Sequence, residues 1–165
     1  MIEMLVAVFI FTVSLAALMS IASRGLKASH QAQKQVIADY LALEGVEVVR
    51  NLRDSAFLSF NNTNNWQNVF NQNGCLSSVG SPCEFTLTGT SIVLQPCDSG
   101  VCTVYFDGTV YRHDESGASW DDSGYIREIN LTPSANPNEI NATVLVTWNN
   151  GQDSVSYSEN LFLWL

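Results

Sequence analysis

The stretch "MIEMLVAVFIFTVSLAALMSIASRG" (residues 1–25) decides the fold that we expect for this chain. The 19 residues from Met4 to Ala22 carry no charge and no proline. A helix of that length crosses about 30 Å of hydrocarbon. Its few hydroxyl side chains can bond to preceding carbonyls of the same helix. The sequence therefore predicts a membrane-length apolar helix over residues 1–24.

The helical pattern continues beyond the apolar segment. No proline occurs before Pro82, and apolar side chains recur at helical spacing up to about Asp54. The side chains expected to share one stripe are Ile37, Tyr40, Leu41, Val48, Val49 and Leu52. A helix of this length would be on the order of 80 Å long, which a small domain cannot cover. Only its amphipathic half, residues 25–54, is expected to pack on the rest of the chain.

Two glycines interrupt this helix. Each lowers helix stability by about 1 kcal/mol relative to alanine. Gly25 lies where the apolar half meets the polar half, and it is either a flexing point or a tolerated surface glycine. Gly45 lies within the amphipathic half.

The rest of the chain predicts a loop followed by a sheet. Residues 55–84 are rich in Asn, Ser and Gly, which favours a connecting loop with a short helix near residues 66–70. Alternating patterns after it predict strands at 85–95, 101–106, 109–113, 125–131, 141–148 and 154–164, within a head of residues 85–165. Short turns such as Asp107-Gly108 imply antiparallel neighbours. We therefore expect an α+β fold, a long helix on a small antiparallel sheet.

Charge is distributed unevenly along the chain. Residues 1–54 hold five basic and five acidic side chains, whereas residues 55–165 hold two basic and eleven acidic ones, so the net charge is −9. Non-specific nucleic-acid binding requires a basic footprint. We therefore infer no direct nucleic-acid binding, and an acidic head is typical of a soluble surface.

Four cysteines follow the helix: Cys75, Cys83, Cys97 and Cys102. Their spacing matches no common zinc site, and no histidine lies near them. An even number behind a membrane segment favours disulfides in an oxidising compartment. Because each neighbouring pair brackets turn-forming residues, we predict bonds Cys75–Cys83 and Cys97–Cys102 rather than the other two connectivities.

Signatures of catalysis are missing from the sequence. The two histidines, His30 and His113, lie far apart in the chain, and no nucleophile elbow or phosphate-binding loop occurs. We expect no enzyme activity, no cofactor and no metal-dependent chemistry. The acidic stretch 114–124 leaves two interpretations open, a calcium site formed by Asp114, Asp121 and Asp122 or a solvated loop.

Glu3 is the only ionisable side chain among the first 23 residues. Near a helix N-terminus the helix dipole stabilises an anion, and lipid headgroups can solvate it. Deep in hydrocarbon an unpaired carboxylate would cost roughly 2.5–3.5 kcal/mol. Charge alone leaves two readings open, an interfacial anion or a carboxylate that pairs with a cation of a neighbouring subunit.

The stretch "MIEMLVAVFIF" (residues 1–11) resembles the N-terminus of bacterial type IV pilins and pseudopilins. In that family a leader peptide ends in glycine, and the mature chain begins Phe-Thr-Leu-Ile-Glu before an apolar helix. Met1-Ile2-Glu3 is similar to the last three of these positions, with Met in place of Leu. The resemblance is specific over about residues 1–23 and looser up to Asp54, and the head is similar only in kind.

The resemblance implies a structural subunit with a pilin fold. Such a subunit waits in the cytoplasmic membrane until an assembly ATPase and a platform protein polymerise it into an extracellular filament. That filament would serve adhesion, motility or DNA uptake. Glu3 matches the glutamate of the family that neutralises the amino terminus of a neighbouring subunit. The residues implied to pack in the filament core are Ile2, Leu5, Val6, Phe9, Ile10, Val13 and Ala17.

Two alternatives accompany this prediction. Within the same family, the chain could be a minor pilin or a type II secretion pseudopilin. Outside it, the chain could be a membrane-anchored ligand-binding domain whose helix serves only as a tether.

Overall fold

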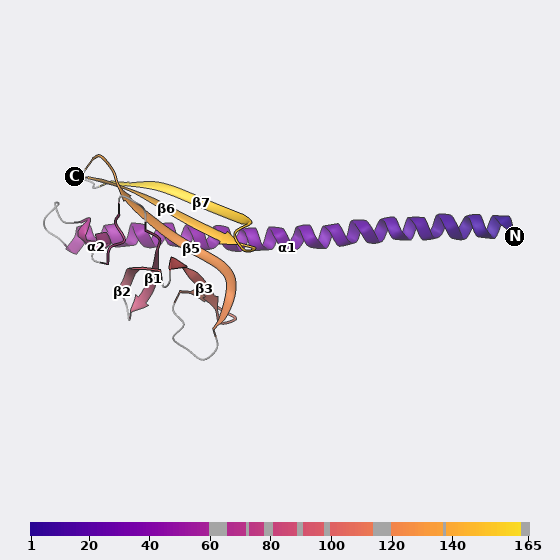
Figure 1. Ribbon diagram of the computed structural model, residues 1–165, viewed down its shortest axis with the longest axis horizontal. Helices are drawn as coiled ribbons and strands as arrows, with labels where there is room; N and C mark the ends of the chain where they lie inside the picture. Colours follow the sequence, from indigo (N-terminus) through magenta and orange to yellow (C-terminus); the bar gives the residue numbers. More distant parts are fainter. Residues whose placement is uncertain are drawn as a thin grey trace. The chain divides into compact units, whose positions relative to one another are not determined.

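The computed structural model describes residues 1–59, 66–71, 73–77, 81–88, 91–97, 100–113, 120–136 and 138–162. Two helices lie in these ranges, α1 (Ile2–Ser59) and the short α2 (Asn68–Asn71). The strands follow as β1 (Cys83–Thr88), β2 (Ser91–Pro96), β3 (Thr103–Phe106), β4 (Tyr111–Arg112), β5 (Asp121–Pro133), β6 (Glu139–Trp148) and β7 (Asp153–Phe162) (Figure 1). The chain divides into two compact units, residues 1–37 and 38–165.

The first unit consists of the N-terminal part of α1. Every side chain from Met1 to Val36 is exposed. The hydroxyl of Thr12 donates a hydrogen bond to the Phe9 carbonyl at 2.9 Å, and that of Ser14 to the Ile10 carbonyl at 2.8 Å. These two polar groups are therefore satisfied within the helix, as the sequence predicts.

The second unit contains a sheet built around β5. One edge of β5 pairs with β6, which pairs in turn with β7. Its other edge is shared by β3, over Asp121–Ile126, and by β1 at Ile129. Hairpins add β2 to β1 and β4 to β3. Each of these strand pairs is antiparallel, which confirms the predicted α+β class with an antiparallel sheet.

Several element bounds differ from the prediction. Residues 85–95, expected as one strand, form the hairpin of β1 and β2, paired from Cys83–Pro96 to Thr88–Ser91. Gly89 in the middle of that run was the signal for a break, although residues 89–90 lie outside the described ranges. Helix α1 continues past the expected end at Asp54 to Ser59, and β5 is longer than the predicted 125–131.

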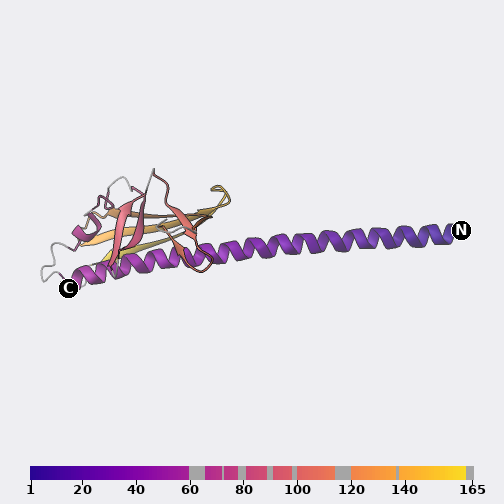
Figure 2. The same cartoon turned by 90° about the horizontal axis from the view of Figure 1, so that it is seen from below.

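The C-terminal part of α1 lies along the sheet in both views (Figures 1 and 2). Alternate residues of β5 and β6 are buried, as a half-covered sheet requires. The hydrophobic residues that α1 buries share one face with the buried Gly45: Ala38, Leu41, Ala42, Val48, Val49, Leu52 and Ala56. Tyr40, expected in this stripe, is 71% exposed. Small residues face the sheet, so the backbone approaches closely and the bulky Tyr40 lies beside the contact.

Both disulfides hold segments at the same edge of β5. They join Cys75 to Cys83 and Cys97 to Cys102, which is the predicted pairing. Cys83 pairs with Ile129 of β5, and the Cys102 carbonyl accepts a hydrogen bond from Arg127 N at 3.0 Å. The first bond therefore ties the segment around Cys75 to the N-terminal end of β1, and the second ties the end of β2 to the segment before β3, both next to the central strand.

Candidate functional site

The apolar part of α1 is the first candidate site. Among the described residues, α1 is the one helix whose length and composition would allow it to cross a membrane, and none of that segment is buried by the chain itself. The side chains implied to pack in a filament core are all exposed: Ile2, Leu5, Val6, Phe9, Ile10, Val13 and Ala17. This face therefore needs lipid or protein to cover it.

Glu3 lies in the first turn of α1. The positive end of the helix dipole stabilises an anion at that position. The helix geometry thus accounts for a carboxylate at this end of an uncharged segment. Its pairing with a neighbouring subunit stays a prediction.

A buried arginine forms the centre of a second candidate site. Arg127 lies in the inward-facing row of β5 between Tyr125 and Ile129, and none of its surface is exposed. Its Nη1 donates to the Glu44 carboxylate at 2.5 Å and to the Leu41 carbonyl at 3.3 Å. Arg127 is thereby tied to α1 from the middle of the sheet.

The rest of the Arg127 guanidinium contacts residues outside α1, in β1 and just after β4. Its Nε donates to His113 Nε2 at 3.1 Å, and the group lies 4.1 Å from the centre of the Phe85 ring, in cation–π geometry. Arg127 Nη2 is buried without a hydrogen-bond partner among the described residues. Burial lowers the pKa of Arg127, while the nearby Glu44 and Glu84 carboxylates oppose that shift. We call Glu44, Glu84, His113 and Arg127 the buried polar cluster.

His113 is neutral in this cluster. Burial and the adjacent Arg127 charge lower the pKa of His113 to about 3. The ring nitrogens fit one tautomer, because Nδ1 lies 3.0 Å from the Thr103 carbonyl and Nε2 accepts from Arg127. Nδ1 is also 3.5 Å from the Glu84 carboxylate, a contact that is not an ion pair while the ring is neutral. A histidine in this state is a weak proton acceptor near pH 7.

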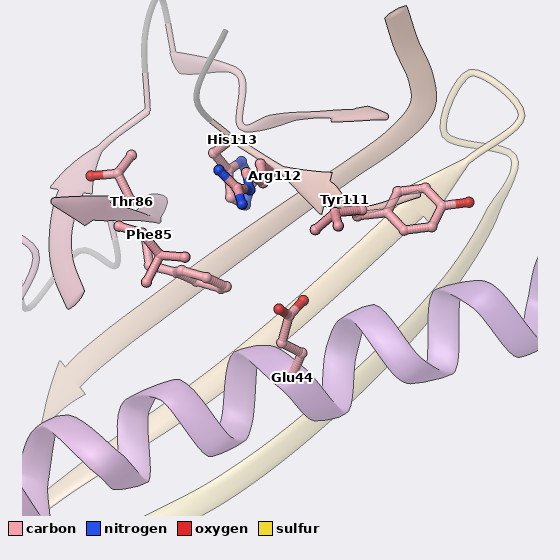
Figure 3. A pocket seen from close by; sticks show the side chains of 8 residues that line it. Glu44, Phe85, Thr86, Tyr111, Arg112 and His113 are labelled. Carbon is pink, nitrogen blue, oxygen red and sulfur yellow. The ribbon is translucent and has the colours of Figure 1, made fainter. Parts of the chain in front are cut away.

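A small cavity adjoins the cluster. Its volume is about 90 Å³, and its walls include Glu44, Phe85, Tyr111 and His113. Figure 3 shows the Glu44 carboxylate pointing from α1 toward the segment that carries Arg112 and His113. Pockets for small-molecule ligands are usually about 300–1,000 Å³. This cavity therefore offers room for water rather than for a sizeable ligand.

The buried polar cluster is not predicted from the sequence. Glu44 lies outside the apolar stripe expected for the helix, and Arg127 is one of the two basic residues of the segment 55–165. The available signal was the position of Arg127 in the alternating pattern "YIREINL", where an apolar residue is expected. Its partners come from segments distant in sequence, so only the tertiary structure identifies them.

The proposed calcium ligands are not all described. Asp114 lies outside the described residues, whereas Asp121 and Asp122 begin β5. The Asp122 carboxylate accepts a hydrogen bond from Gly124 N at 2.8 Å. Within the described ranges no three His, Cys, Asp or Glu side chains are grouped so that they could hold a metal ion.

Comparisons with protein-family models, curated proteins and solved structures find no match for this chain. The architecture of a long, N-terminally apolar helix on an antiparallel sheet is compatible with a pilin-like fold. Function is therefore inferred from the geometry of the chain itself.

Proposed function

We propose that this chain is a structural subunit that homopolymerises into an extracellular filament like a type IV pilus. The observation that carries this proposal is the exposed, uncharged helical segment of 19 residues that follows Glu3. The chain buries none of it. Lipid would cover the segment before assembly, and identical helices of neighbouring subunits would cover it in the filament.

The exposed surface argues that the segment does not remain in water. Large side chains such as Phe9 and Phe11 are more than 60% exposed. Each Å² of apolar surface removed from water stabilises by about 25 cal/mol. Helices that leave lipid for a bundle keep their apolar faces dry, so a subunit can move between membrane and filament at small cost.

Pairing of Glu3 with a neighbouring subunit would set how one subunit is aligned with the next. A carboxylate that enters an apolar bundle is stabilised only when a cation approaches it. The amino terminus of a neighbouring subunit is the cation that the family resemblance implies. An assembly ATPase and a platform protein in the cytoplasmic membrane would drive the transfer.

Substitution of Glu3 tests the proposal. Glu3→Gln keeps the size of the side chain and removes its charge, so the head should fold and the chain should enter the membrane, while filaments disappear. The matched control is Ser14→Ala, which removes a hydroxyl already bonded within its own helix. Filaments are scored by negative-stain microscopy, and tryptophan fluorescence checks the head. Normal filament yield from Glu3→Gln would show that the pairing role is wrong.

A minor pilin or a secretion pseudopilin would share these features and form a short tip or pseudopilus. Assembly of long filaments from the wild-type chain alone separates the two possibilities. A tethered ligand-binding domain would instead remain monomeric in detergent.

A further inference from the structure

A groove lies on the open side of α1, next to β7. It has a volume of about 640 Å³. We call it the acidic groove and define it by Tyr40, Leu43, Glu47, Arg50, Tyr157 and Glu159. It is open because β7 is only partly covered, and Leu161 is its one buried side chain among the residues described. The groove between α1 and β7 is therefore accessible to a partner.

Carboxylates dominate this groove. Arg50 lies between two carboxylates, with its Nη1 3.5 Å from Glu47 Oε2 and its Nη2 2.6 Å from Glu159 Oε2. Glu44 also contributes to the lining of the groove. Because Glu44 is paired with the buried Arg127, the two carboxylates of Glu47 and Glu159 against the one guanidinium of Arg50 leave the groove an excess of one negative charge. The apolar parts of the walls are exposed as well, since Tyr40 is 71% and Leu43 48% accessible. Such a surface fits a cationic partner with an aliphatic stem.

A complementary surface lies on the first unit of the same chain. Arg24, Lys27 and Lys34 are exposed on α1, and no acidic residue occurs between Glu3 and Asp39. At 3.6 residues per turn these three cations fall within roughly 80° of the helix circumference. We call them the basic stripe. Counting Lys, Arg, Asp and Glu gives residues 1–37 a charge of +3 − 1 = +2 and residues 38–165 a charge of +4 − 15 = −11.

We propose that the acidic groove of one copy of this chain binds the basic stripe of a second copy. This inference rests on the proposed function and specifies one contact between successive subunits. Each chain carries one groove and one stripe, so the contact can repeat from copy to copy along a polymer. Lysine and arginine stems would lie on Tyr40 and Leu43, while their charged groups reach Glu47.

The test is a charge exchange in the full-length chain. Self-association is measured in detergent by energy transfer between donor- and acceptor-labelled chains. Lys27→Glu and Glu47→Lys should each weaken it roughly 3- to 10-fold, since each replaces an attraction by a repulsion. A 1:1 mixture of the two variants should restore wild-type affinity, because every mixed contact pairs opposite charges again.

Two control variants separate the contact from net charge. Lys27→Arg keeps the stripe charge, and Asp121→Lys makes the same charge change as Glu47→Lys at an exposed position of β5. Both should associate like the wild type. The wild-type affinity should also fall as salt is raised from 50 to 500 mM.

The outcomes distinguish this inference from the proposed function. Restoration in the mixture supports the contact. Single variants that associate like the wild type, or a mixture that stays weak, overturn the contact and leave polymerisation standing. If the single variants weaken self-association only when phosphatidylglycerol is added, the basic stripe binds lipid headgroups, and the proposed contact is overturned. A wild-type chain that does not self-associate contradicts both proposals.

Discussion

Gly45 of α1 lies so close to Val144 of β6 that no side chain at position 45 would fit between the helix backbone and the valine. A Cβ atom added at Gly45 would lie 2.8 Å from Val144 Cγ1 and 3.3 Å from Val144 Cγ2. Val144 is fully buried, and its branched side chain has little rotameric freedom. The glycine that weakens the helix in isolation is therefore required by its contact with the sheet.

Gly45→Ala should destabilise the head despite the higher helix propensity of alanine. The propensity gain is about 1 kcal/mol, and overpacking a tight core costs about 1–3 kcal/mol. We expect a net loss on the order of 1 kcal/mol in the free energy of unfolding, measured by urea titration of the full-length chain with tryptophan fluorescence. Trp66 and Trp148 are buried in the second unit, residues 38–165, and report on its unfolding.

Gly25→Ala is the matched control for that substitution. No atom lies within 4 Å of a Cβ at Gly25, so the urea midpoint of the head should not change. Adding Val144→Ala to Gly45→Ala should remove the clash and show a favourable coupling between the two positions. Equal urea midpoints for Gly25→Ala and Gly45→Ala would contradict the close approach.

Glu44→Gln should destabilise the head more than Glu47→Gln does. Glu44 neutralises the buried Arg127, whereas Glu47 has a side chain that is 73% exposed and pairs with Arg50 at 3.5 Å. Removing one partner of a buried pair leaves the other charge uncompensated. The Glu44 side chain is 49% exposed and glutamine retains an acceptor, so we expect a loss of about 1–3 kcal/mol, against less than about 1 kcal/mol for Glu47→Gln. The same urea titration compares them, and equal losses would show that the pair with Arg127 contributes little.

His113 should make the stability of the head depend on pH. Its pKa is about 3 in the folded chain and about 6.5 when unfolded, so unfolding takes up a proton between these values. The stability that comes from keeping His113 neutral is fully present above pH 6.5. As the pH falls toward 3, the free energy of unfolding decreases by about 1.4 kcal/mol per pH unit. Carboxylates titrate in the same range, so the readout is the difference in slope between wild type and His113→Gln.

The control for the pH experiment is His30→Gln, at the exposed histidine of α1. Glutamine at position 113 can accept from Arg127 and donate to the Thr103 carbonyl without titrating. Its stability should therefore fall less steeply between pH 6.5 and 3 than that of the wild type. Parallel curves for wild type and His113→Gln would mean that His113 is not held neutral.

Removing either disulfide should lower the stability of the head. Cys75–Cys83 closes a loop of 8 residues and Cys97–Cys102 a loop of 5. By restricting the unfolded chain, the first bond should stabilise the fold by about 2.5 kcal/mol and the second by about 2 kcal/mol. Thermal unfolding of each paired Cys→Ser variant, compared with the reduced wild type, checks this. Because both bonds anchor segments at one edge of β5, losing both should cost at least their sum. An unchanged melting curve after full reduction would contradict a stabilising role.

Patterns between neighbours in the chain made most of the architecture predictable. Hydrophobic periodicity identified α1 and the strands that became β5, β6 and β7, and the turn residues Asp107-Gly108 identified the hairpin of β3 and β4. The residues Asn149-Asn150-Gly151 form the turn between β6 and β7. The structure places Gly108, Asn149, Asn150 and Gly151 at positive φ, as such turns require. The alternating pattern continues on both sides of Gly89, so it predicted one strand where the structure has the hairpin of β1 and β2.

The sequence by itself determined the uncharged segment after Glu3, the antiparallel sheet and the local disulfides, because each depends on residues close together in the chain. Tertiary structure alone decided that Tyr40 lies outside the buried face of α1, that Gly45 meets Val144, and that Arg127 binds Glu44 and His113. These contacts join segments up to about a hundred residues apart, and their energies arise only when folding removes water from between them.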